Sequence, residues 1–134
     1  MSPLLDLRAA VRAILVADAT LTGLIGGPNV YDRAPPGASP PYVAFGDALA
    51  RDWSTGSDHG FEILFAIDCW SKQPGEAEAL AIADRCLALL EDAAPPLSSW
   101  RLVGLRALAL ETKRERSGRY LRATLRMRGV VEPP

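Results

Sequence analysis

The chain has 134 residues, of which 49% are hydrophobic and 23% are charged, and its formal net charge is −1. This length and composition are typical of one globular domain with a single core, so residues 1–134 are predicted to form one domain, and a disordered chain is excluded. No stretch approaches the ~20 apolar residues of a membrane-spanning helix, and the N-terminus lacks the pattern of a secretory signal. We therefore expect a protein made in the cytoplasm, with no membrane partner.

The charge is distributed unevenly along the chain. Residues 101–134 contain nine basic and three acidic residues, a net charge of +6, so residues 1–100 hold six basic and thirteen acidic residues, a net charge of −7. A domain with one basic and one acidic region is suited to head-to-tail contact with copies of itself or to binding a charged partner. The same pattern is compatible with a solvated basic hairpin.

The first quarter of the chain predicts two helices. Ser2-Pro3 is typical of a helix start, and apolar residues then recur at helical spacing up to residue 15, with Asp6 on the opposite, polar side. A short second helix is expected over residues 18–25, because Asp18 or Thr20 can cap it and Gly-Gly-Pro follows it.

The next segment predicts strands joined by polar connections. Residues 30–32 are extended, residues 33–41 contain four prolines and form a stiff connector, and residues 42–48 resume as a strand. Residues 51–60 are polar and contain glycine, which indicates a loop. Trp53 in this loop either packs back over the edge of the core or is held out for a partner, since tryptophan is enriched at interface hot spots.

The most apolar unit is a strand over residues 60–70 followed by a helix over residues 76–90. Odd-numbered residues of the strand are apolar, whereas its even-numbered face is half polar. The helix has a broad apolar face made of Leu80, Ile82, Ala83, Cys86, Leu87, Leu89 and Leu90. Cys69 and Cys86 both face the predicted core and have no metal or redox spacing, so we interpret them as buried structural thiols.

The C-terminal third predicts a long β-hairpin with a turn at Ser117-Gly118. Both faces of residues 101–110 are moderately apolar. Residues 120–131 alternate cleanly, with an apolar inner face packed on the helices and an outer face that carries the arginine row, namely Arg122, Arg126 and Arg128. The predicted class is α+β, with a mostly antiparallel four- to five-stranded sheet, two main helices on one face and this long C-terminal hairpin.

No group of residues indicates catalysis or metal binding. Asp58-His59 is the only acid-histidine pair, and no nucleophile motif accompanies it, so solvated loop residues are favoured over a small hydrolase that uses His59. One histidine, two core cysteines and scattered carboxylates lack the spacing of metal ligands. Residues 23–27 are glycine-rich but lack the lysine of a phosphate loop. We expect no enzyme activity, no cofactor and no metal.

The arginine row and the loop at residues 51–59 are the candidate interaction surfaces. Basic residues around the hairpin turn could bind phosphates and Tyr120 could stack on a base, but Glu111 and Glu115 interrupt the patch. Arginine also pairs with carboxylates at protein interfaces, and plain solvation remains an alternative. The candidate interface residues are Arg51, Asp52, Trp53, Arg114, Arg116, Arg119, Arg122, Arg126 and Arg128.

Several segments, in their order and spacing, resemble the tail-completion proteins of long-tailed phages. This family is also known as tail terminators or head-to-tail joining proteins, and it occurs in prophages and gene transfer agents. The resemblance covers nearly the whole chain. The matching segments are the N-terminal helix followed by residues 18–32, Pro35-Pro36, Pro40-Pro41-Tyr42-Val43-Ala44-Phe45-Gly46, Asp68-Cys69-Trp70-Ser71, the helix at 76–90 and Arg119-Tyr120-Leu121-Arg122-Ala123.

The resemblance implies a virion structural protein in the tail or neck of a phage-like particle. It implies a ring, of six copies, that caps the finished tail tube, stops its polymerisation and joins it to the head connector. The implied partners are copies of the chain itself, the tail tube protein and the head connector or stopper protein, with DNA at most passing through the ring lumen. Because a positively charged lumen would retard DNA, we assign the arginine row to contacts between subunits. The alternative is a nucleic-acid-binding module that uses the arginine hairpin.

Overall fold

The computed structural model describes residues 1–54, 56 and 59–134. Within these residues the strands form one five-stranded sheet in the order β1-β2-β3-β5-β4, in which β1 is parallel to β2 and all other pairs are antiparallel. The predicted α+β class and the C-terminal hairpin are confirmed. The elements are α1 (Pro3–Ala17), α2 (Ala19–Ile25), β1 (Val30–Tyr31), β2 (Tyr42–Asp52), β3 (Phe61–Ser71), α3 (Ala77–Leu90), β4 (Arg101–Arg114) and β5 (Leu121–Glu132).

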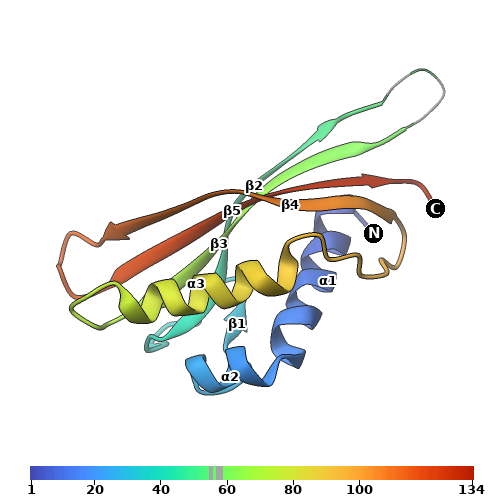
Figure 1. Ribbon diagram of the computed structural model, residues 1–134. Helices are drawn as coiled ribbons and strands as arrows, with labels where there is room; N and C mark the ends of the chain where they lie inside the picture. The colour runs from blue at the N-terminus through green and yellow to red at the C-terminus, as the bar shows by residue number, and fades with distance from the viewer. Residues whose placement is uncertain (55, 57–58) are drawn as a thin grey trace.

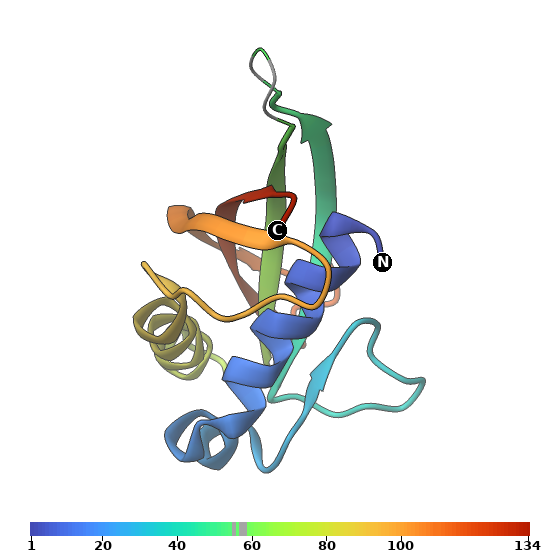
Figure 2. The same cartoon turned by 90° about the vertical axis from the view of Figure 1, so that its right-hand side faces the viewer.

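The helices all lie on one face of the sheet, below it in Figure 1. Two hairpins reach beyond this helical layer: the β2–β3 hairpin extends to the upper right of Figure 1, and the β4–β5 hairpin extends to the left. Figure 2 shows the β2–β3 hairpin rising past both α1 and α3. The opposite face of the sheet, which we name the outer face, is left uncovered by the described residues.

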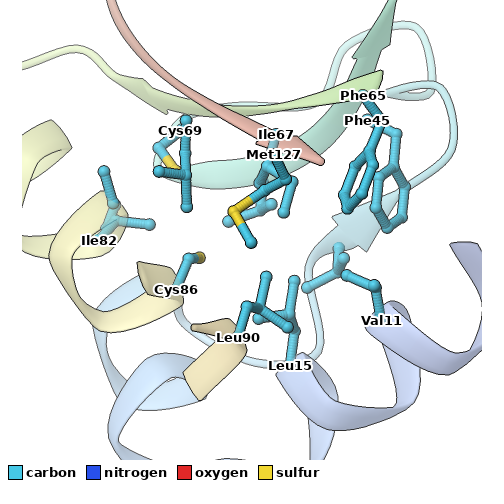
Figure 3. Packing of buried hydrophobic residues seen from close by; sticks show 14 of the residues in the cluster. Val11, Leu15, Phe45, Phe65, Ile67, Cys69, Ile82, Cys86, Leu90 and Met127 are labelled. Carbon is cyan, nitrogen blue, oxygen red and sulfur yellow. The ribbon is translucent and has the colours of Figure 1, made fainter. Parts of the chain in front are cut away.

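The core lies between the inner face of the sheet and the helices. Figure 3 shows Leu15 of α1 and Leu90 of α3 directed toward Met127 and Ile67 of the sheet, and these four side chains are fully buried. Cys69 and Cys86 are buried free thiols, as predicted. A hydrogen bond between them, together with burial, raises the pKa of Cys69 well above its usual value. Leu87, predicted to face the core, is only partly buried.

Asp18 fastens the first two helices to the third. Its carboxylate accepts the Leu21 N–H at 2.9 Å, which caps α2. The same carboxylate accepts two hydrogen bonds from the Arg85 guanidinium of α3, at 2.8 and 2.7 Å. These bonds, those from Arg85 above all, lower the pKa of Asp18 to about 2.

Asp6 joins α1 to the connection between α3 and β4. The sequence places this residue on the polar side of its helix, but it is only 2% exposed. Its carboxylate accepts the backbone N–H groups of Ser98, Ser99 and Trp100 at 2.9, 2.7 and 3.1 Å. Burial alone would raise the pKa of Asp6, but these three hydrogen bonds outweigh it and leave the pKa below its usual value.

β2 extends four residues beyond its predicted end, so Arg51 and Asp52 belong to a strand and not to a loop. Leu49 to Asp52 pair in register with residues 61–64 of β3. The long strand β3 provides backbone hydrogen-bond partners for residues 49–52. These hydrogen bonds extend β2 although the sequence of its last residues is polar.

Truncation of a fully buried leucine of α3 tests the position of the core. Leu90→Ala is expected to lower the free energy of unfolding by about 3 kcal/mol, through lost burial and the cavity left behind, as measured by urea denaturation. Leu87→Ala, a matched truncation three residues earlier, is expected to cost clearly less because Leu87 is partly exposed. Equal losses would show that the core-facing side of α3 is misassigned.

The pH dependence of stability tests Asp18. Its pKa is about 2 in the folded chain against an ordinary value of 3.8, so the unfolded chain binds more protons in this window. Stability contributed by Asp18 is therefore complete above pH ~4 and is lost as the pH falls toward 2. Asp18→Asn keeps the capping oxygen but should flatten this fall in urea titrations. Asp84→Asn, at an exposed aspartate of α3, should leave the slope unchanged, and an equal effect of both substitutions would refute the assignment.

Candidate protein interface

The outer face of the sheet holds most of the residues singled out in the sequence. Directly paired residues of neighbouring antiparallel strands share a face, so the register of the sheet defines this surface. Its main side chains are Leu49 and Arg51 from β2; Glu62, Leu64, Asp68 and Trp70 from β3; Glu111 and Lys113 from β4; and Arg122, Thr124, Arg126 and Arg128 from β5.

Glu62 links three strands across this face. It accepts hydrogen bonds from Arg51 of β2 and from Arg128 of β5, each at 2.5 Å, although it is only 7% exposed. The bond from Arg128 and then that from Arg51 hold the pKa of Glu62 below its usual value. Trp53 lies against this group, with its ring centroid 5.7 Å from the Arg128 guanidinium carbon. Trp53 was expected either to pack back over the edge of the core or to be held out for a partner. In the structure its ring contacts Arg128 of the same chain, and its side chain is half exposed.

The other two members of the arginine row also have partners within the chain. Arg126 contacts Glu111 of β4 through Nε and a terminal nitrogen, at 2.9 and 2.8 Å. Arg122 stacks on Trp70, 5.5 Å from the ring centroid, and its Nε is buried without a hydrogen-bond partner in the described part of the chain. Two arginines of the row therefore contact carboxylates and the third contacts an aromatic ring. The alternating pattern of β5 alone did not indicate these contacts.

The remaining candidates lie at the ends of the two hairpins. Arg114 donates to the Pro74 carbonyl at 2.5 Å, Arg119 lies over the ring of Tyr120, and Arg116 is exposed at the β4–β5 turn. Asp52 accepts a hydrogen bond from the Ser54 hydroxyl, and this bond lowers the pKa of Asp52. The structure thus brings Arg51, Trp53 and Arg128 together but leaves the turn arginines apart from them.

The acid-histidine pair contributes no site in the described residues. Asp58 lies outside those residues, and His59 is exposed in the β2–β3 connection. Among the described residues no group of three or more histidine, cysteine or acidic side chains could hold a metal ion. No helix in that part of the chain is long and apolar enough to cross a membrane.

An apolar hollow in the middle of the outer face was missed by the sequence analysis. A bulge in β4 between Ala107 and Ala109 brings Leu108, 57% exposed, to the rim of this hollow beside Leu49, which is 53% exposed. The moderately apolar character of both faces of residues 101–110 was the signal that could have indicated it. The hollow has a volume of about 280 Å³ and is lined by Asp47, Ala48, Leu49, Leu64, Phe65, Leu108, Arg126 and Met127.

A smaller polar hollow of about 120 Å³ adjoins the apolar one, because both are lined by Asp47 and Arg126. Asp68 is fixed in it by the Thr124 hydroxyl, which donates to the carboxylate at 2.7 Å. A Cβ atom at Gly46 would lie 2.7 Å from the other Asp68 oxygen, so glycine is needed there. An apolar hollow beside a polar one suits the side chains of another protein, because it offers burial and hydrogen bonds at adjacent points.

Comparison with known proteins identifies the family. A family model described as "Tail completion protein gp17" matches residues 9–132. The chain belongs to this family. This tail completion protein is therefore a structural component of phage-type tails and not an enzyme, as the resemblance of its segments implied.

A solved structure supports the same assignment. The tail completion protein is similar to a chain in a structure titled "Virion of native gene transfer agent (GTA) particle", with 36% sequence identity, a TM-score of 0.87 and coverage of 95% of both chains. A search of curated proteins found no match. The fold and the family together identify the tail completion protein as a virion component of a phage or gene transfer agent particle.

Removal of the Glu62 charge tests its role in the outer face. Glu62→Gln leaves Arg51 and Arg128 close together without their shared carboxylate, so we expect a clear loss of stability in urea denaturation at low salt. Glu111→Gln removes the partner of Arg126, but both members of that pair are about half exposed, so little change is expected. A larger loss for Glu111→Gln would contradict this ranking.

Proposed function

We propose that this tail completion protein is a ring-forming tail terminator. In this proposal, six copies form a ring on the finished tail tube, stop its polymerisation and join it to the head connector. The observation that carries the proposal is the likeness, over 95% of both chains, to a chain of a gene transfer agent virion. The partners are therefore copies of the chain itself, the tail tube protein and the connector protein.

The outer face has the physical character of a protein interface. Its centre is the apolar hollow of Leu49, Leu64 and Leu108, and burial of such leucines is favourable by about 25 cal/mol per Å² of apolar surface. Arg51 and Arg128 pair with Glu62, and Arg126 pairs with Glu111, within the chain, so these three arginines need no counter-ion from a partner. The uneven charge of the chain supports a heterologous, head-to-tail contact, which closes into a ring when the rotation permits.

These contacts favour a protein partner over DNA. A phosphate-binding surface needs arginines that are available to the backbone of the nucleic acid, whereas Arg126 and Arg128 are held by carboxylates of the same chain. We therefore assign the arginine row to the edge of a subunit contact. In the proposed ring, DNA at most passes through the lumen.

Assembly on tail tubes tests this proposal. The purified protein is expected to bind the ends of tail tubes as a ring visible by electron microscopy, with its mass given by light scattering. Leu108→Asp places an unpaired carboxylate beside the apolar hollow and should weaken assembly at least about tenfold, equivalent to ~1.4 kcal/mol.

Leu5→Asp is the matched control. Leu5 is also exposed, but it lies in the first turn of α1, where an acidic residue is tolerated, so assembly should remain unchanged. No association with either tail tube or head connector would refute the proposed function. Normal assembly of Leu108→Asp would instead remove the hollow from the interface.

A further inference from the structure

The sheet has two edge segments whose backbone groups are available for pairing. β4 forms one border of the sheet. At the other border, β1 pairs only with Val43 and Ala44 of β2, so the later half of β2 has no strand beside it in the described part of the chain. Unpaired strand edges are templates for pairing with another chain.

Two hydrogen bonds fix which backbone groups of β4 point away from the sheet. The Ala107 N–H donates outward to the Glu91 carboxylate at 2.6 Å, and the Leu105 carbonyl accepts the Asp92 N–H at 3.0 Å. Alternation beyond the bulge at residues 107–109 places the outward groups at 110, 112 and 114. The described residues supply no hydrogen-bond partner for these three outward positions.

The same reasoning applies to β2. The Val43 N–H points outward, where it donates to the Asn29 carbonyl at 3.0 Å, and the Trp53 N–H points inward, to the Gly60 carbonyl at 2.9 Å. Between them lies the bulge separating Phe45 from Ala48. Alternation therefore places the outward backbone groups at residues 48, 50 and 52, which matches the three positions on β4.

We propose that β4 of one subunit pairs with β2 of the next, so that residues 108–114 and 46–52 form an antiparallel ladder between neighbouring copies. This inference rests on the proposed ring. Three antiparallel pairings separate β2 from β4 in the sheet, so the two edges run in opposite directions. Copies related by rotation therefore present these edges to one another as an antiparallel pair, and each copy uses both edges once.

The side chains of the two segments fit this pairing. Neither segment contains proline, the residue that most directly blocks an edge. The register that aligns Ala48 with Thr112 also aligns Ala50 with Leu110 and places Asp47 opposite Lys113. A cross-strand pair of opposite charge is favourable, and alanine at positions 48 and 50 leaves the approach to the β2 edge unobstructed.

A cysteine pair tests the contact and its register. Ala48→Cys combined with Thr112→Cys should bring two Cα atoms of neighbouring copies to about 5.5 Å, within the range of a disulfide. In one subunit these positions are separated by three strand spacings, roughly 14 Å across the sheet, and are further displaced along the strands, which excludes an internal bond. Oxidation of assembled rings with oxidised glutathione should give a ladder of covalent oligomers that ends at the number of subunits in the ring.

The control is Ala48→Cys combined with Val103→Cys, which places the second thiol at an exposed site of β4. Because this site lies outside the proposed strand pairing, oxidation should give no covalent oligomers. Cys69 and Cys86 are fully buried and remain in all variants.

A proline at the same edge gives an independent measurement. Thr112→Pro removes an outward N–H that is not used in the β4–β5 ladder, so the circular dichroism spectrum should be retained while binding to tail tubes falls at least about tenfold. Thr112→Val keeps the N–H and loses only the hydroxyl, which donates to Glu76, so it should assemble normally.

The outcomes separate the edge contact from the ring itself. Rings that form on tail tubes but give no disulfide ladder would overturn the edge contact and leave the proposed function intact. Absence of rings under every condition would overturn both. If Thr112→Pro fails to fold, the cysteine pair alone decides.

Discussion

The fold depends on the one-sided burial of β3. This central strand is paired along its length with β2 and β5, and its inner side chains Ile63, Ile67 and Cys69 are fully buried under the helices. Its other side carries Glu62 and Asp68, which the helices do not cover. Because the other side of β3 is half polar, the sheet forms a two-layer structure whose outer face is left uncovered by the described residues.

The elements in which apolar residues recur at regular spacing were predictable from the sequence. The alternation of β3 and β5 and the helical spacing of α1 and α3 follow from which residues must face a core, and those elements were placed within a few residues of their observed bounds. The cap at Ser2 was recognised, and Asp18 was one of the two candidates for the cap of α2, because a capping side chain bonds to the backbone a few residues away. The broad stripe on α3 did not show that Leu87 lies at the margin of the core, since the position of a helix on a sheet depends on the rest of the chain.

Features that depend on distant partners were not predictable. Asp6 is buried because the backbone of residues 98–100 supplies three donors, and nothing near Asp6 in the sequence indicates this. Arg128 and Arg126 are paired because the register brings Glu62 and Glu111 beside them. Leu108 lies at the rim of the apolar hollow because a bulge in β4 shifts the alternation by one residue. The sequence indicated a candidate interface on the C-terminal hairpin, but it did not indicate the apolar hollow on the same face of the sheet.

The two hydrogen bonds that Glu91 and Asp92 make to the middle of β4 have a consequence for aggregation. A fourteen-residue edge strand with all its outward groups available would favour uncontrolled sheet extension. The two hydrogen bonds from the end of α3 interrupt this edge at residues 105 and 107. Bulges on either side, between Leu102 and Gly104 and between Ala107 and Ala109, twist it. What remains on either side are short segments, whose few backbone bonds are too weak to drive open-ended aggregation. A domain built in this way presents only short lengths of unpaired edge, and these resist aggregation better than an uninterrupted fourteen-residue edge would.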